Sequence, residues 1–164
     1  MKIRLASPIS NHSTADGLGF RIVIWNQGCR CQCPGCHNPE TWKMTGGLEK
    51  DTKELIDFIQ KNKDTNTGVT LSGGDPFLQP EANIEIADAA HSYGLDVWAY
   101  CGLTFEEILQ DKDKKALLEK CDVLVDGPFI LAQRNISLAF RGSSNQRIIN
   151  VKESLKNGRV VEYL

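Results

Sequence analysis

The alternation of strand-like and helix-like segments constrains the fold of this chain more than any other feature. Residues 20–25 are mostly β-branched or aromatic, which is typical of a strand. Amphipathic stretches separate this segment from further apolar runs of strand length. Such alternation predicts βαβ units around a mostly parallel sheet, and therefore an α/β fold. The other predicted strands are 3–5, 69–71, 95–100, 121–125, 147–151 and 159–163; predicted helices begin at 51 and 104 and cover 81–93 and 114–120.

Two of the helix starts carry a capping pattern. Asp51 is followed three residues later by Glu54, and Thr104 by Glu107. In a capping box the first side chain accepts a backbone N–H of the new helix, and the acidic side chain reaches back to the cap. We therefore expect helices to begin at both positions. Gly94 is expected to end the preceding helix, because glycine adopts the left-handed C′ conformation without strain.

Length and charge exclude several classes of protein. The 164 residues fit one domain, which we expect to span 1–164, and they are too few for a closed (β/α)8 barrel of about 250 residues. Nineteen basic and 21 acidic side chains give a formal charge of −2, which does not point to nucleic acid or to a membrane surface. No apolar run approaches the ~20 residues of a membrane span. The first residues lack the apolar stretch of a signal peptide, so we expect a cytoplasmic protein.

The segments with the most distinctive residues follow predicted strands. A cysteine-rich loop follows residues 20–25, and Gly73-Gly74, Cys101-Gly102 and Asp126-Gly127 follow the next three strands. In open α/β sheets, ligands bind at the carboxyl ends of the strands. These loops are therefore expected to meet at one ligand-binding edge.

Four of the six cysteines lie within residues 29–36. A secreted disulfide framework would spread its cysteines along the chain, whereas clustered thiols in a cytosolic protein hold metal or perform redox chemistry. The spacing of Cys29, Cys33 and Cys36 allows three thiolates to surround one iron–sulfur cluster. Such clusters usually have four cysteine ligands, so three ligands leave one iron open for a substrate.

Other interpretations of the cysteine loop remain open. Cys29, Cys33, Cys36 and His37 could hold zinc, although structural zinc sites usually draw their ligands as two separated pairs. The thiols could also be reduced side chains without a ligand. Cys31 is interpreted as a bystander, with a role as cluster ligand as the alternative.

The three-cysteine motif and Gly73-Gly74-Asp75-Pro76 together resemble the radical S-adenosylmethionine superfamily. More narrowly, the chain is similar to the activating enzymes of anaerobic (class III) ribonucleoside-triphosphate reductases. The Asp-Gly-Pro-Phe and Arg-Gly-Ser-Ser-Asn-Gln segments mark this subfamily. The matching segments are 13–21, 25–29, 33–38, 41–42, 71–76, 97–100, 125–129 and 141–146.

The resemblance implies an open, partial (β/α)6 barrel and two cofactors. In the superfamily, three cysteines hold a [4Fe–4S] cluster, and its fourth iron chelates the amino and carboxylate groups of S-adenosylmethionine. One electron from the reduced cluster splits the sulfonium into methionine and a 5′-deoxyadenosyl radical. In the activating enzymes this radical takes a hydrogen atom from a glycine of a partner protein, here anaerobic ribonucleoside-triphosphate reductase. A one-electron donor such as flavodoxin is also implied.

The resemblance also assigns residues to the cofactors. Cys29, Cys33 and Cys36 would bind the cluster, and Gly73 and Gly74 would meet the methionine amino group. The expected contacts of S-adenosylmethionine are Gly35, Cys36, His37, Asn38, Gly73, Gly74, Asp75, Tyr100 and Asp126. For several of these a structural role stays open: Tyr100 as core packing, and Asp126 as the cap of a turn. The polar stretch 141–146 is expected near the cofactor carboxylate, near the partner, or in a solvated loop.

Two alternative activities remain. One is activation of another glycyl radical enzyme, of the pyruvate formate-lyase type, which the His37 position favours. The other is a small-molecule radical enzyme resembling 7-carboxy-7-deazaguanine synthase. The short chain favours a protein substrate, because an incomplete barrel leaves one side open for a glycine-bearing loop and the partner would supply the missing wall.

Overall fold

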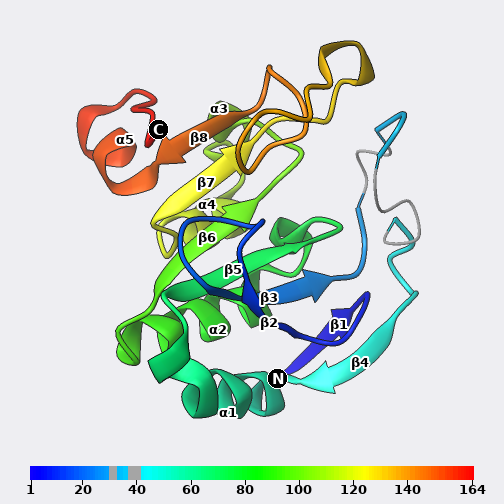
Figure 1. Cartoon of the computed structure of the whole chain (residues 1–164), viewed down its shortest axis with the longest axis vertical. Helices are drawn as coiled ribbons and strands as arrows, with labels where there is room; N and C mark the ends of the chain where they lie inside the picture. Colours follow the sequence, from blue (N-terminus) through cyan, green and yellow to red (C-terminus); the bar gives the residue numbers. More distant parts are fainter. Residues whose placement is uncertain (30–32, 37–41) are drawn as a thin grey trace.

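The computed structural model describes residues 1–29, 33–36 and 42–164. Within these residues eight strands form one sheet, in the order β4-β1-β3-β5-β6-β7-β8, with β2 paired to β3 (Figure 1). The sheet is not closed, since β4 and β8 lie at opposite edges. The strands are β1 Lys2–Leu5, β2 Ser10–Ser13, β3 Arg21–Asn26, β4 Leu48–Asp51, β5 Gly68–Gly73, β6 Asp96–Tyr100, β7 Val123–Asp126 and β8 Arg147–Asn150.

The four central strands, β3, β5, β6 and β7, are mutually parallel, as the alternation predicted. Their carboxyl ends therefore meet at one edge of the sheet. The strands beside them run antiparallel: β1 and β2 against β3, and β8 against β7. The prediction of an open, mostly parallel α/β sheet is confirmed, and the antiparallel strands finish its edges.

Helices cover one face of the sheet. The helix α2 packs on β5 and β6 and contacts α1 and α4 on either side (Figure 1). Side chains of β3, β5 and β6 that point toward these helices form the main core, for example Ile24, Leu71 and Val97. The helices are α1 Thr52–Asn62, α2 Pro80–Ser92, α3 Phe105–Ile108, α4 Lys112–Leu118 and α5 Val151–Asn157; the 3-10 turns are η2 Lys63–Thr65, η3 Pro76–Leu78 and η4 Leu131–Gln133.

The other face of the sheet carries a smaller cluster. Because side chains alternate along a strand, Val97 and Ala99 of β6 point into the main core, whereas Trp98 and Tyr100 belong to the opposite face. Phe140, from the long connection between β7 and β8, packs edge-on against Trp98 with ring centroids 5.4 Å apart. This aromatic face borders the site described below.

Some local predictions are confirmed and others are wrong. Thr104 and Glu107 form the full capping box at α3, while Asp51 caps α1 by accepting the Lys53 N–H. The strands β2 and β4 were missed, and the predicted strand 159–163 is reduced to a single bridge between Ile149 and Glu162. No helix in the described ranges has both the length and the apolar character needed to cross a bilayer.

Candidate functional site

A cavity of about 510 Å³ opens at the carboxyl ends of the parallel strands. Its walls include Trp25 from β3, Gly73 from β5 and Tyr100 from β6. The cysteine loop contributes Cys36. The volume lies within the range of small-molecule and cofactor sites, and its position is the one expected for ligands of open α/β sheets.

The cysteine loop is tied to this edge by backbone hydrogen bonds. The Cys29 N–H donates to the carbonyl of Trp42 at 3.1 Å, and the Asp75 N–H donates to the carbonyl of Gly28 at 2.7 Å. A tight turn closes within the loop, where the Cys36 N–H donates to the carbonyl of Cys33 at 3.0 Å. The loop is thereby held beside the end of β5.

The three predicted cluster cysteines lie close enough to influence one another. Burial raises the pKa of the Cys33 thiol, and the charges of Cys29 and Cys36 raise it further. A hydrogen bond from the Phe129 backbone opposes this rise in pKa. Three cysteines grouped around Cys33 supply the kind of ligand that iron–sulfur clusters use in proteins.

Among the described residues, no three His, Cys, Asp or Glu side chains converge on one metal position. Zinc would need each sulfur about 2.3 Å from one centre, whereas a cluster binds each sulfur to a different iron. The fourth zinc ligand considered above, His37, lies outside the described residues, as do Asn38 and Cys31.

Gly35 fits the cysteine loop against the connection that follows β7. Its φ is +76°, in the left-handed region that favours glycine. A Cβ at this position would lie 2.9 Å from a methyl carbon of Leu131 and 3.3 Å from the ring of Phe129. Glycine therefore lets the loop pack directly on these two side chains.

Gly73 has two reasons to be glycine. Its φ is +102°, and a Cβ would lie 2.4 Å from the backbone N and O atoms of Asn26 on the neighbouring strand. The bare backbone thus lines the cavity next to β3. The N–H of Gly74 is occupied, because it donates to the carbonyl of Asn26 at 2.8 Å.

Asp75 is buried just behind the cavity wall. Its carboxylate caps η3 by accepting the Phe77 N–H at 2.9 Å, and it accepts the Cys101 thiol at 3.4 Å. Burial raises the pKa of Asp75, and burial raises that of the Cys101 thiol as well. The structure therefore gives the Asp75 side chain a role in shaping the loop after β5.

Tyr100 lines the cavity and fixes the connection after β7. Its hydroxyl donates to the carbonyl of Phe140 at 2.6 Å, and burial raises its pKa well above the usual value. Phe140 also lines the cavity and has a φ of +62°, which a non-glycine residue rarely adopts. Tyr100 and the edge-on Trp98 thus hold a strained backbone segment in the cavity wall.

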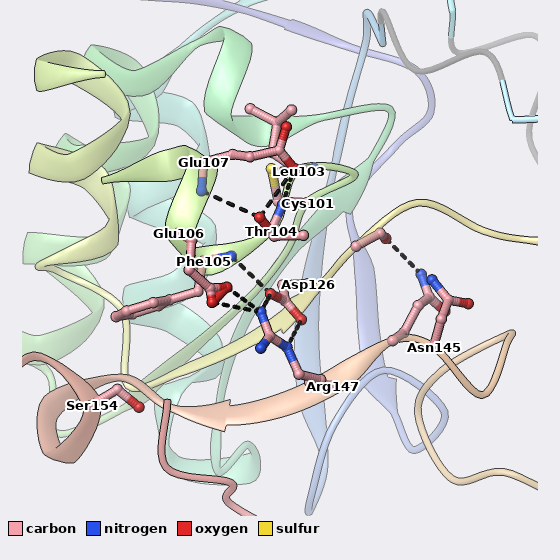
Figure 2. Close-up of polar contacts among 12 residues, drawn as sticks. Cys101, Leu103, Thr104, Phe105, Glu106, Glu107, Asp126, Asn145, Arg147 and Ser154 are labelled. Carbon is pink, nitrogen blue, oxygen red and sulfur yellow. Dashed lines mark hydrogen bonds and ion pairs between the residues drawn. The ribbon is translucent and has the colours of Figure 1, made fainter. Parts of the chain in front are cut away.

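Asp126 is brought to the same edge but its carboxylate is fully engaged, as Figure 2 shows. It accepts the Phe105 N–H at 2.7 Å and two bonds from Arg147, at 2.6 Å from Nη2 and 3.1 Å from Nε. Arg147 also contacts Glu106 at 2.6 Å, and this hydrogen bond lowers the pKa of Glu106. Asp126 is 1% exposed and joins β7, β8 and the start of α3. Its carboxylate thus has a structural role, but it binds α3 and Arg147 and does not cap the turn that follows it.

The polar stretch 141–146 is attached to the loop after β7. Asn145 Nδ2 donates to the carbonyl of Pro128 at 2.8 Å, and Gln146 Nε2 donates to that of Gly127 at 3.0 Å (Figure 2 shows the first). Gln146 Oε1 accepts the N–H of Gly142 at 2.9 Å. The stretch therefore forms a wall of the cavity, and Arg141, Gly142 and Gln146 line it.

Sequence reasoning had not assigned several lining residues to the site. Asp16, Trp25, Phe129, Leu138 and Phe140 all line the cavity. For Trp25 a usable signal existed, because it precedes the cysteine loop by four residues on a predicted strand. Two buried donors near the site also lack an acceptor within the described part of the chain: Trp42 Nε1 and Arg141 Nε.

Comparisons with known proteins identify the family of the chain. The model of a family described as a 4Fe–4S single cluster domain matches residues 15–149. The anaerobic ribonucleoside-triphosphate reductase-activating protein of Haemophilus influenzae is 33% identical over 144 residues, covering 84% of this chain and 92% of the relative. Its counterpart from Vibrio cholerae is 38% identical over 142 residues, which cover 81% of this chain and 89% of that relative.

Two further proteins are similar to this chain over a smaller share of their own length. The pyruvate formate-lyase-activating enzyme of Clostridium pasteurianum is 38% identical over 113 residues, which cover 64% of this chain and 48% of that enzyme. The crystal structure of QueE from Escherichia coli has the same fold, with a TM-score of 0.55 and 16% identity over 77% of this chain and 70% of QueE. On the strength of the matches over most of its length, the chain belongs to the 4Fe–4S single cluster domain family and, within it, to the anaerobic ribonucleoside-triphosphate reductase-activating proteins.

Proposed function

We propose that this protein generates a glycyl radical on anaerobic ribonucleoside-triphosphate reductase. The observation that carries the proposal is the meeting of three interacting thiols, Cys29, Cys33 and Cys36, with a cofactor-sized cavity at the carboxyl edge of the sheet. The names of the relatives supply the partner.

The residues fit both implied cofactors. Cys29, Cys33 and Cys36 would hold the [4Fe–4S] cluster, and the cavity beside Cys36 would hold S-adenosylmethionine. When bound, this pair supplies a one-electron cleavage that yields a radical able to remove a hydrogen atom from a glycine. The protein needs no acid or base for this step, and its own task is to position the cofactors and exclude water.

The cavity residues have distinct tasks in this proposal. Gly73 presents bare backbone to the methionine end, and Tyr100 keeps the Phe140 segment in place over the cavity. Gly35, Gly74, His37 and Asn38 are proposed as further cofactor contacts from the family resemblance. Asp75 and Asp126 act through the backbone of the loops that they cap.

The open sheet provides a route for the substrate. We infer that the glycine-bearing segment of the reductase enters along the unclosed side and completes the barrel wall around the cavity. Residues 1–164 would act as one domain in the cytoplasm, with a one-electron donor such as flavodoxin reducing the cluster.

Pyruvate formate-lyase is the second candidate partner. The relative from Clostridium pasteurianum favours it, but that similarity covers less than half of that enzyme. The likeness to QueE concerns the fold and carries no argument for a small-molecule substrate.

Anaerobic reconstitution with iron and sulfide tests the proposal. The reconstituted protein, dithionite and S-adenosylmethionine are mixed with either the reductase or pyruvate formate-lyase, and 5′-deoxyadenosine and the glycyl radical signal are measured. We expect both products with the reductase. A radical only on pyruvate formate-lyase would show that the reductase is not the partner. Absence of 5′-deoxyadenosine in both mixtures would refute radical chemistry.

A further inference from the structure

Arg141 has an unusual environment for a half-buried arginine. It lines the cavity, and its Nη1 donates to the carbonyl of Gln146 at 2.6 Å. That hydrogen bond fixes the guanidinium against the backbone of the cavity wall. Its Nε is buried and has no hydrogen-bond acceptor in the described ranges of the chain.

Two other arginines show how this protein satisfies a guanidinium. Arg21 is completely buried and donates to Thr70, to the carbonyls of Leu18 and Val69, and to Asp96. Arg147 pairs with Asp126 and Glu106. Arg141, by contrast, makes no ion pair with any carboxylate of the described residues, so its charge is available to something that enters the cavity.

An unpaired buried donor has a clear physical consequence. It loses its hydrogen bond to water without regaining one in the fold, and this is unfavourable. An acceptor oxygen supplied by a ligand would restore the bond, and a carboxylate suits a guanidinium best because it accepts two parallel N–H donors. The wall of the cavity therefore contains an arginine whose hydrogen bonds are not all satisfied within the described residues.

The charges of the cavity favour a zwitterionic ligand. Among the described residues that line the cavity, Asp16 supplies the one carboxylate and Arg141 the one guanidinium. The Asp16 carboxylate is held by the Ser13 hydroxyl at 2.6 Å and helps to raise the pKa of Tyr100, so it lies near that side chain. S-adenosylmethionine carries a cationic sulfonium and amino group and a single carboxylate.

We propose that Arg141 binds the carboxylate of S-adenosylmethionine and thereby selects the cofactor by its methionine end. This assignment rests on the proposed function, because it assumes that the cavity holds this cofactor. The sulfonium and amino groups would be repelled by the guanidinium, and the adenine and ribose offer only neutral acceptors. Arg141 thus distinguishes the cofactor from analogues that lack the carboxylate.

Binding of two ligands to the reconstituted protein tests the assignment. Dissociation constants for S-adenosylmethionine and for decarboxylated S-adenosylmethionine are measured by equilibrium dialysis with wild type, Arg141→Met and Arg141→Lys. Arg134→Met is the matched control, because Arg134 is an exposed arginine of the same connection and does not line the cavity.

We expect Arg141→Met to weaken binding of S-adenosylmethionine by about 10- to 100-fold, the loss expected for a charge-assisted hydrogen bond. Binding of the decarboxylated analogue should change by less than about threefold. Arg141→Lys should recover part of the loss, and Arg134→Met should behave as wild type.

Two results would overturn the assignment alone. One is that Arg141→Met weakens the binding of both ligands equally, which would indicate a general defect of the cavity. The other is unchanged binding with a loss of radical formation on the reductase, which would assign Arg141 to the protein partner. If wild type bound neither ligand, the proposed function itself would fail, and this outcome is distinct from both.

Discussion

Two neighbouring regions at the carboxyl edge of the sheet use arginine in opposite ways. In the ion-pair network of Asp126, Arg147 and Glu106, the buried carboxylate accepts three hydrogen bonds and the guanidinium contacts two acids. In the cavity wall a few residues earlier, Arg141 has a buried donor without an acceptor in the described chain. The difference separates a region that stabilises the fold from a region prepared for a ligand.

The two regions should respond differently to substitution. Substitutions in the ion-pair network should lower the free energy of unfolding, since they break contacts that the folded chain has already made. Substitutions of side chains in the cavity and cysteine loop should change cofactor content or binding while the unfolding free energy of the cofactor-free protein changes little. Gly73 is the exception, because a Cβ there would collide with the backbone of β3. The following predictions test that separation, beginning with the largest effect.

Cys33→Ala should abolish the cluster. Removing one of three thiolate ligands leaves two, and we expect activity to fall by more than about 100-fold, the upper range for changes to residues that merely support a metal ligand. Iron and sulfide content, visible absorbance and 5′-deoxyadenosine formation are measured after anaerobic reconstitution.

Cys121→Ala is the matched control for that change. Cys121 is buried in the core, where its thiol donates to the carbonyl of Leu117 at 3.4 Å. It should keep a full cluster. A Cys33→Ala protein with a normal [4Fe–4S] cluster would contradict the ligand assignment.

Arg147→Met should destabilise the protein by about 3 kcal/mol, because it leaves the buried Asp126 carboxylate without its partner. Arg141→Met should change stability by less than about 1 kcal/mol, because the lost bond to Gln146 is offset by removal of an unsatisfied donor. Urea unfolding of the cofactor-free proteins measures both. Equal destabilisation by the two substitutions would remove the distinction between the regions.

Gly73→Ala should cost about 2–4 kcal/mol, and Gly127→Ala about 1 kcal/mol. Both glycines have positive φ, +102° and +96°, but a Cβ at Gly73 would collide with the Asn26 backbone, whereas at Gly127 the nearest atom is 3.6 Å away. Thermal unfolding compares the two variants. A smaller effect at Gly73 than at Gly127 would show that the strands adjust more easily than this geometry allows.

Glu106→Gln should have the smallest effect, about 0.5 kcal/mol at pH 7, because the Glu106 side chain is 58% exposed and its pair with Arg147 is screened by water. The hydrogen bond with Arg147 lowers the pKa of Glu106 in the folded state. Its stabilisation is therefore present above the ordinary pKa of 4.5 and is lost as the pH falls through the lower folded value. The stability difference between wild type and variant should shrink below pH 4.5, and a difference that grew there would contradict this sign.

The fold was predictable where a segment's own residues determine its structure. The buried apolar strand β5 and the Thr104–Glu107 capping box are local patterns. The strands β2 and β4 were not predictable, because their sequences Ser-Asn-His-Ser and Leu-Glu-Lys-Asp are mostly exposed and become strands only through pairing with β3 and β1.

The site divides in the same way. Cys36, Gly73 and Tyr100 follow from motifs and strand ends, and the structure brings them to one cavity. The engagement of Asp126 depends on Arg147, which lies opposite it on β8 and 21 residues later in the chain. Pairing between β7 and β8, and not a local pattern, brings the Asp126 carboxylate to Arg147.

Hydrogen transfer from the partner tests the central claim most directly. The reductase is prepared with glycine deuterated at the α-carbon and mixed anaerobically with the reconstituted protein, reductant and S-adenosylmethionine, and the 5′-deoxyadenosine is analysed by mass spectrometry. We predict that it gains one deuterium as the glycyl radical signal appears on the reductase. Deuterium-free 5′-deoxyadenosine accompanied by the full radical signal would contradict direct abstraction at this site.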